Sequence, residues 1–236
     1  MTKKALLPLL LLLSVLFHSI PAAAGSAYVF FNLGASPQKF EADKLDFASG
    51  GTQSLKKDNT LSDTGVLLGL GLGVDLKKTS SNLPLRLDVA YNYRSGGYEK
   101  RVDNLFNYKV TSLSTLLLNC NFDLPLGSSV KPYIGLGLGL GFIGYKTNGS
   151  YYYNRPGYSA YVKSESEGIS SAFAYRLGLG AAYDLSERLT VDLGYSYNGT
   201  GEFTTLLLKE SGLVREVNVK GKASMHDFVL SLRINV

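Results

Sequence analysis

The sequence predicts an all-β fold: an eight-stranded antiparallel transmembrane β-barrel, preceded by a cleaved signal peptide. Three observations predict it. They are an apolar leader, period-two alternation of apolar and polar residues in eight segments, and connections that are alternately short and long. The composition agrees, because 26 glycines, 16 tyrosines and only 7 prolines in 236 residues point toward strands rather than helices.

Residues 1–24 have the features of a secretory signal. Lys3 and Lys4 form a basic start, residues 5–17 are almost unbroken apolar sequence, and Pro21 precedes three small alanines. The alternative is a membrane-anchoring helix, but the apolar run is short for a span that needs about 20 residues. We therefore expect cleavage after Ala24 and one β-barrel domain over residues 25–236.

The composition of residues 25–236 excludes several classes of protein. Without Lys3 and Lys4 there are 22 basic and 19 acidic residues, and a dispersed net charge of +3 is too mild to indicate nucleic acid. Cys120 is the only cysteine and cannot form an internal disulfide. No segment is apolar and charge-free over about 18 residues, which excludes a helical membrane protein. We see no motif for a metal or a cofactor and expect neither.

Alternation gives each of the eight segments one apolar and one mixed face, since successive side chains point to opposite faces of a strand. The third, seventh and eighth segments alternate most regularly, whereas glycine is the small inward residue of the second, fifth and sixth. The first has the weakest pattern, and we assign Val29, Phe31 and Leu33 to its outward face. The segments are residues 28–35, 66–75, 85–94, 116–124, 134–142, 173–184, 189–198 and 227–236.

The connections alternate in length. Short ones follow every second segment, at residues 77–84, 125–132 and 186–188, and long polar ones occupy residues 36–64, 95–109, 146–170 and 199–224. Transmembrane barrels have short turns on one side and longer loops facing the outside. Hydrocarbon tolerates no unpaired strand edge, so the last strand is expected to pair with the first.

Aromatic residues near the strand ends favour lipid over water outside the barrel. Belts of tyrosine and phenylalanine with aliphatic residues between them are typical of the two membrane interfaces. The predicted girdle comprises Tyr91, Tyr93, Tyr195 and Tyr197 on one rim and Phe122 and Tyr183 near the other. The alternative, a soluble lipocalin-like barrel, would invert the faces and place Arg86 and Asp88 in solvent.

Three segments carry a resemblance to a known family: PYIGLGLGLGF (132–142), LTVDLGYSY (189–197) and FVLSLRINV (228–236). They resemble the small outer-membrane barrels of the OmpA, OmpX and opacity-protein type, over nearly the whole mature chain. The resemblance implies a porin-family surface antigen of the Gram-negative envelope, in contact with outer-membrane lipid and lipopolysaccharide. It also implies an assembly signal, read by the barrel-assembly machinery, in which Val236 replaces the family's usual phenylalanine. The signal comprises Phe228, Leu230, Leu232, Ile234 and Val236.

The mixed face collects charges of both signs, which must be paired if they are buried. We expect an ion network with trapped water, acting either as a gated path for small solutes or as a plug. An eight-stranded interior is about wide enough for side chains to fill, which favours the plug. Inward glycines of the second and fifth segments are expected to make room for the arginines and for Tyr133. The predicted luminal network is Asp75, Arg86, Asp88, Arg94, Asp123, Arg176, Asp184, Asp192, Asp227 and Arg233.

Catalysis has one candidate pair, Ser224 and His226, on one face of the last strand. A lipid A acyl hydrolase would need His226 to activate Ser224, with Glu202 or Glu216 orienting the ring. Phe228 shares that face, so the alternative is a histidine at the headgroup boundary. We expect no enzyme, and a polar interior that offers no acyl pocket.

The loops are the remaining candidates for function, because the third combines mixed charge with clustered tyrosines. Such tyrosines either form a recognition surface or pack on one another or on lipopolysaccharide. The cluster is Tyr151, Tyr152, Tyr153, Tyr158 and Tyr161. The first hypothesis is thus a structural, adhesin- or antigen-like surface barrel that contacts a host or envelope protein, and no nucleic acid. A narrow porin-like channel is the second hypothesis, and the acyl hydrolase is the third.

Overall fold

The computed structural model describes residues 27–47, 51–54, 60–78, 83–97, 99–102, 106–126, 129–155, 158–208 and 217–236. The predicted signal peptide and its cleavage site lie outside these residues, and both stay predictions. No helix in the described part of the chain is long and apolar enough to span a membrane.

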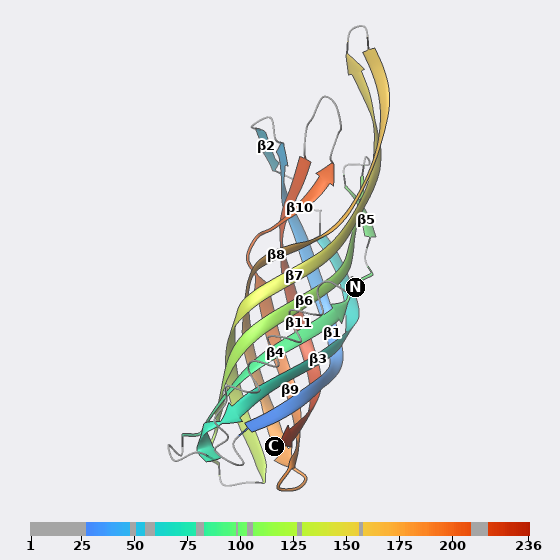
Figure 1. The fold of residues 1–236 in the computed structure, drawn as a ribbon. Helices are drawn as coiled ribbons and strands as arrows, with labels where there is room; N and C mark the ends of the chain where they lie inside the picture. Colours follow the sequence, from blue (N-terminus) through green and yellow to red (C-terminus); the bar gives the residue numbers. More distant parts are fainter. Residues whose placement is uncertain are drawn as a thin grey trace.

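Eight long strands form a closed antiparallel ring (Figure 1). The ring runs β1-β3-β4-β6-β7-β8-β9-β11, and β11 returns to pair with β1, for example Leu33 with Leu230. This confirms the predicted eight-stranded barrel and its closure. The strands are β1 Ala27–Phe47, β3 Thr60–Asp75, β4 Leu85–Ser95, β6 Phe106–Asp123, β7 Val130–Arg155, β8 Tyr158–Asp184, β9 Leu189–Thr200 and β11 Val217–Asn235.

The long connections differ from the sequence prediction, because much of each is strand rather than loop. β1 continues through Phe47, and β7 and β8 stay paired as far as Arg155 and Tyr158, in a hairpin that rises above the barrel (Figure 1). Three short strands extend the same end, which we call the hairpin end, and η1 (Leu76–Lys78) lies at the opposite, short-turn end. They are β2 Gly51–Ser54, β5 Glu99–Val102 and β10 Phe203–Leu208.

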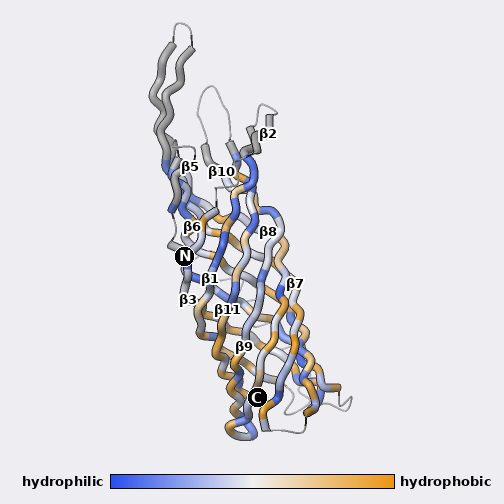
Figure 2. Tube along the Cα trace, turned by 180° about the vertical axis from the view of Figure 1, so that it is seen from behind, coloured by the Kyte–Doolittle hydropathy of each residue, from blue (hydrophilic) through white to orange (hydrophobic). Residues whose placement is uncertain are grey.

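Toward the short-turn end, hydrophobic and polar residues alternate along the strands (Figure 2), and the exposed outward side chains are apolar while the buried inward ones are polar. Leu136 and Leu138 on β7 expose 61% and 60% of their surface, and Phe31 and Leu33 point outward as assigned. β4 alternates strictly, with Arg86, Asp88 and Arg94 buried. A soluble monomer rarely exposes so large an apolar surface, which therefore faces lipid. We call this part the membrane zone.

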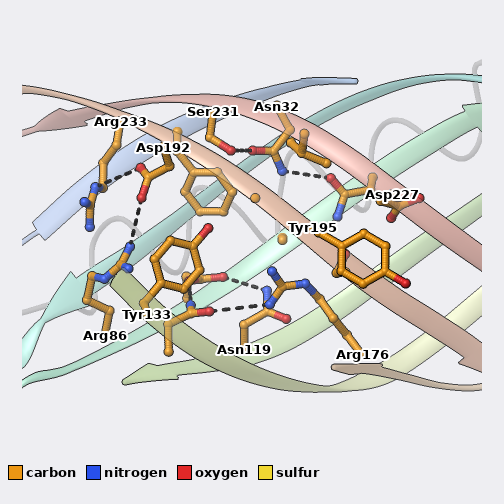
Figure 3. A pocket seen from close by; sticks show the side chains of 18 of the residues that line it. Asn32, Arg86, Asn119, Tyr133, Arg176, Asp192, Tyr195, Asp227, Ser231 and Arg233 are labelled. Atoms are coloured by element: carbon orange, nitrogen blue, oxygen red, sulfur yellow. Dashed lines mark hydrogen bonds and ion pairs between the residues drawn. The ribbon is translucent and has the colours of Figure 1, made fainter. Parts of the chain in front are cut away.

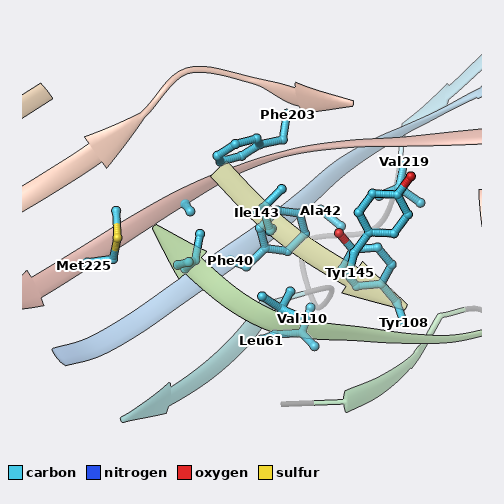
Figure 4. Packing of buried hydrophobic residues seen from close by; sticks show 12 residues of the cluster. Phe40, Ala42, Leu61, Tyr108, Val110, Ile143, Tyr145, Phe203, Val219 and Met225 are labelled. Carbon is cyan, nitrogen blue, oxygen red and sulfur yellow. The ribbon is translucent and has the colours of Figure 1, made fainter. Parts of the chain in front are cut away.

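Toward the hairpin end, the two faces exchange their chemistry. Apolar side chains now point inward and pack together (Figure 4), while Lys39, Glu41, Lys146 and Glu167 are exposed on the outside. The sequence predicts a polar interior. This prediction is wrong at the hairpin end, where the interior is apolar. We call the apolar cluster the cap; it comprises Phe40, Ala42, Leu61, Tyr108, Val110, Leu113, Ile143, Tyr145, Phe203, Val219, Ala223 and Met225.

Candidate functional site

The lowest layer of the lumen is built around Arg86 of β4. Its guanidinium binds both carboxylate oxygens of Asp123 on β6, with Nε–Oδ distances of 3.0 Å and an Nη2–Oδ1 distance of 2.7 Å. Asp192 of β9 lies between two arginines, 3.7 Å from Nη1 of Arg86 and 3.6 Å from Nε of Arg233 (Figure 3). These four residues form a connected ion network across the barrel.

Aromatic rings support the arginines of this layer. The Arg86 guanidinium lies 4.7 Å from the centre of the Tyr133 ring, and that of Arg233 lies 5.3 Å from the Tyr28 ring. Cation–π contact of this kind is favourable where water is scarce. A Cβ at Gly180 would lie 2.6 Å from the Tyr133 hydroxyl oxygen, so glycine on β8 gives the tyrosine its space, whereas the sequence had pointed to glycines of the second and fifth segments.

The middle layer surrounds Asp88, which has neutral donors rather than a paired cation. Tyr28 donates its hydroxyl at 3.2 Å, and the amides of Asn119 and Asn121 donate at 2.7 and 2.8 Å. Arg176 approaches from β8, with its Nη1 3.4 Å from Oδ1 of Asn121. Neutral donors can therefore hold a buried carboxylate where no arginine reaches it.

The upper layer is a fully buried pair, Arg94 of β4 and Asp227 of β11. Their side chains are 0% and 3% exposed and bind in a fork, with N–O distances of 3.0 and 2.6 Å. Ser36 and Asn198 donate to the same carboxylate at 2.6 and 2.8 Å, and Arg94 also donates to Thr115 at 3.1 Å. A bidentate pair with its remaining sites bonded is the arrangement that makes buried charge tolerable.

The described lumen thus holds as many arginines as aspartates. Two of the ten predicted residues lie instead at the short-turn mouth: Asp75 accepts from the Lys77 amide, and Asp184 binds Lys131 and Thr190. Partial burial acts to raise the Asp184 pKa, but the bonds from Lys131 and Thr190 outweigh it and lower that pKa. The luminal charges are Arg86, Arg94, Arg176, Arg233, Asp88, Asp123, Asp192 and Asp227.

Two hollows interrupt the lumen on either side of the lowest layer. A cavity of about 80 Å³ lies between the layers, lined by Asn32, Asn92, Arg176 and Ser231 among others (Figure 3), and has room for a few waters. A wider vestibule of about 320 Å³ opens at the short-turn end beside Asp123 and Arg233. The cap lies beyond the cavity, so buried apolar side chains follow the polar part of the lumen toward the hairpin end.

Neither the neutral hydrogen-bond partners of the luminal charges nor the cap residues are among the residues predicted from the sequence. Asn32, Asn198 and Ser36 share the inward parity of the charged residues, which is the signal that could have found them. The cap had a similar signal. Phe40 alternates with Lys39 and Glu41 in the same phase as the strand below, but within a stretch whose composition suggested a loop.

The candidate catalytic pair lies on the outside of the barrel. Nδ1 of His226 is 2.8 Å from the Tyr195 hydroxyl oxygen, where a triad would need a carboxylate. Ser224 is opposite Lys39 on β1. Oε1 of Glu202 lies 3.8 Å from Nζ of Lys220. Glu216 is outside the described residues. The described residues hold no group of histidine, cysteine and acidic side chains that could bind a metal ion, and Cys120 is exposed.

The predicted girdle residues all lie on outward faces. Phe122 and Tyr183 expose 40% and 48% of their surface near the short-turn end, and the tyrosines are half-buried toward the hairpin end. The predicted loop tyrosines belong to the parts of β7 and β8 that extend beyond the barrel. The structure describes their backbone but not their side chains.

A closed barrel with an apolar outer surface and a charge-balanced lumen defines the class of transmembrane barrels of bacterial outer membranes. Residues 9–228 match the family model of the outer membrane protein beta-barrel domain, and the chain belongs to that family. It is accordingly a protein of the Gram-negative outer membrane.

Comparison with curated proteins adds a partial match. An uncharacterized protein of Brucella abortus is 33% identical over 87 residues, which are 36% of this chain. A protein of Brucella suis matches to the same extent. The chain spans about 30% of the length of these curated relatives.

Solved structures of outer-membrane proteins are also similar. Neisserial surface protein A is 17% identical with a TM-score of 0.48, covering 88% of this chain and 97% of its own. OprG of Pseudomonas aeruginosa is 12% identical with a TM-score of 0.48, covering 90% and 97%. The attachment invasion locus protein of Yersinia pestis is 11% identical with a TM-score of 0.37, covering 86% and 99%.

Proposed function

We propose that this chain is a closed structural barrel that serves as a surface-interaction protein, adhesin- or antigen-like, through its hairpin end. The observation that carries the proposal is the filled lumen. Arg94 and Asp227 satisfy each other's charges, and Phe40, Ile143 and Phe203 of the cap have no exposed surface. A solute that crossed the barrel would have to displace both the Arg94–Asp227 pair and the side chains of the cap. We therefore assign the function to the outside of the barrel.

The length of β7 and β8 supports an interaction role for the hairpin end. A tilted strand crosses the membrane in about 9–11 residues. β7 and β8 have 26 and 27 residues, so more than half of each lies beyond the crossing. We propose Tyr151, Tyr152, Tyr153, Tyr158 and Tyr161 as the recognition residues for a host or envelope protein, since tyrosine is common at binding surfaces.

The hairpin can be removed while every pairing of β7 with β6 is kept. Replacing residues 150–163 by a two-residue Asn-Gly turn joins the paired Gly149 and Ser164 and removes all five tyrosines. Cells that display the shortened barrel should adhere less to cultured host epithelial cells than cells with the full barrel. Equal adherence, at equal surface levels of folded protein, would contradict the adhesin form of the proposal.

A narrow channel is the second candidate, favoured by the vestibule at the short-turn end and by the cavity beyond it. Planar-bilayer recording separates the two functions. We expect no discrete conductance from the wild type. Discrete steps from the wild type would establish the channel and overturn the closed barrel.

The lipid A acyl hydrolase is the least supported candidate. The Tyr195 hydroxyl is hydrogen-bonded to Nδ1 of His226, the nitrogen that an orienting acid would bind, and His226 lies on the outward face of the barrel. Replacing Ser224 and His226 by alanine should leave the lipid A mass profile of overexpressing cells unchanged. A loss of deacylated species in that variant would revive the enzyme.

We also propose that the apolar outward row of β11 is the assembly signal. The row comprises Phe228, Leu230, Leu232, Ile234 and Val236, whose exposed fractions range from 37% to 71%. Replacing Leu230 and Leu232 by serine should lower the folded amount on cells while leaving refolding in detergent intact. Equal loss in both settings would mean that the row acts on stability alone.

A further inference from the structure

Arg233 of β11 differs from the other luminal arginines, each of which makes at least one hydrogen bond. Its side chain is only 8% exposed, yet no hydrogen bond joins its guanidinium to a residue that the structure describes, and its buried Nε has no hydrogen-bond partner. Asp192 lies 3.6 Å away but is shared with Arg86, which already holds Asp123 in a fork (Figure 3). A buried guanidinium with unbonded donors is suited to a planar anion, since its N–H groups match the geometry of a carboxylate.

Arg233 borders the vestibule at the short-turn end of the barrel. The vestibule has a volume of about 320 Å³, near the lower limit of ligand pockets, which range from about 300 to 1,000 Å³. Short turns of outer-membrane barrels face the periplasm, so a ligand would enter the vestibule from there. Farther toward the hairpin end lie the buried Arg94–Asp227 pair and the cap. The vestibule is therefore a pocket that ends at Arg233, and a ligand can bind there without crossing the barrel.

The lining of the vestibule carries charges of both signs. It contains three basic and four acidic side chains, so a multiply charged anion would be repelled. Lys131 is paired with Asp184, whereas the exposed Glu187 has no ion pair with a described residue. Asp75 accepts a hydrogen bond from the backbone amide of Lys77. Acids near the mouth and a guanidinium at the bottom favour a ligand that enters carboxylate first and keeps a positive charge outside.

We propose that the vestibule binds the C-terminal end of a short periplasmic peptide, with the carboxylate on Arg233 and an ammonium group beside Glu187 and Asp75. Arginine holds a carboxylate in a planar fork and so fixes the direction of the chain end. Leu124 and Pro125 belong to the same lining and offer apolar contact to small side chains between the two charged ends. This site lies at the opposite end of the barrel from the proposed interaction surface and does not depend on it.

Three probes test the proposal on the full-length, folded barrel in uncharged dodecyl maltoside. They are the tripeptide lysyl-alanyl-alanine, its C-terminal amide and acetate, and saturation-transfer NMR measures their dissociation constants. We expect the tripeptide to bind about tenfold more tightly than its amide, because the amide cannot form charge-assisted hydrogen bonds with Arg233. Acetate should also bind more weakly, because it has no ammonium group. Equal binding of the tripeptide and its amide, or of the tripeptide and acetate, would overturn the proposal.

Variants locate the site. Arg233→Lys keeps the charge but loses the fork, and should bind the tripeptide about as weakly as the wild type binds the amide. Glu187→Gln should weaken binding of the tripeptide about threefold, the effect of one exposed ion pair, and leave acetate unchanged. Glu167→Gln, the same change at the hairpin end, should have no effect. Equal affinities of Glu187→Gln and Glu167→Gln for the tripeptide would contradict the site. Because Glu187 is exposed, its variant keeps the barrel folded even if Arg233→Lys does not, as a heat-modifiability gel would show.

Discussion

The membrane zone and the cap are built from the same strands but with opposite chemistry on their two faces. On β1, Asn32 faces the lumen and Leu33 the lipid, while a few residues further Phe40 faces inward and Lys39 outward. The inward parity does not change between them. The strand geometry is thus the same in both regions, and the medium outside the barrel, lipid or water, decides which face is apolar.

The two regions are also stabilised by different forces. In the membrane zone the outward side chains meet lipid, and specificity comes from directed bonds in the lumen such as Arg94 to Asp227. In the cap, water surrounds the barrel and the inward side chains pack as in a soluble core. Substitutions of matched chemistry should therefore have different effects in the two regions.

The largest effect is expected from Asp227→Ala, which leaves Arg94 buried without its carboxylate. Loss of one partner of a buried pair costs about 3–5 kcal/mol. Unfolding in urea, followed by circular dichroism in detergent micelles, measures the loss. Asp184→Ala at the exposed mouth is the control and should cost about 1 kcal/mol or less. Similar losses for the two variants would show that the luminal pair is not buried as the structure places it.

A smaller effect is expected from a charge placed on the outward face of the membrane zone. Leu138→Arg should destabilise the folded barrel in lipid vesicles by about 2–4 kcal/mol, as arginine does near the bilayer midplane. Asn148→Arg, also exposed and outward but beside the charged pair of Lys146 and Glu167 beyond the apolar band, should stay within about 0.5 kcal/mol of the wild type. If Asn148→Arg were as costly, the membrane would reach the level of the cap.

The same conservative change should distinguish packed from lipid-facing isoleucine. Ile143→Val removes a methylene group from the closed cap and should cost about 1 kcal/mol. Ile134→Val is on the lipid-facing surface, where acyl chains fill the space, and should cost much less in the same vesicle assay. Equal costs would mean that the cap is loosely packed.

The smallest effect is expected from the exposed pair of Lys146 and Glu167, whose N–O distance is 2.7 Å. The hydrogen bond from Lys146 to Glu167 raises the Lys146 pKa. Any stabilisation from this pair is present below the lysine's unfolded pKa and is lost as the pH rises through the raised value. NMR titration of Glu167→Gln should show a lower Lys146 pKa than the wild type, and an unchanged pKa would exclude the bond.

Alternation could predict the barrel and the inward face of eight of the ten predicted luminal charges because period two fixes the face of every residue on a regular strand. It could not tell that Asp75 and Asp184 lie at the short-turn mouth. It could not predict that Arg94 pairs with Asp227, 133 residues away, since that depends on how the ring closes. The cap was missed for another reason. Phe40 and Met225 stand among lysines, and polar composition suggested a loop where the alternation in fact continues in the same phase.

Thiol labelling of intact cells tests the exchange of faces most directly. In a Cys120→Ser background, Lys222→Cys and Met225→Cys place thiols on the outward and inward faces of one stretch of β11. We expect a membrane-impermeant maleimide to label Lys222→Cys rapidly and to leave Met225→Cys unlabelled until the barrel is unfolded. Labelling of folded Met225→Cys at the rate of Lys222→Cys would show an open, wet interior and contradict the cap.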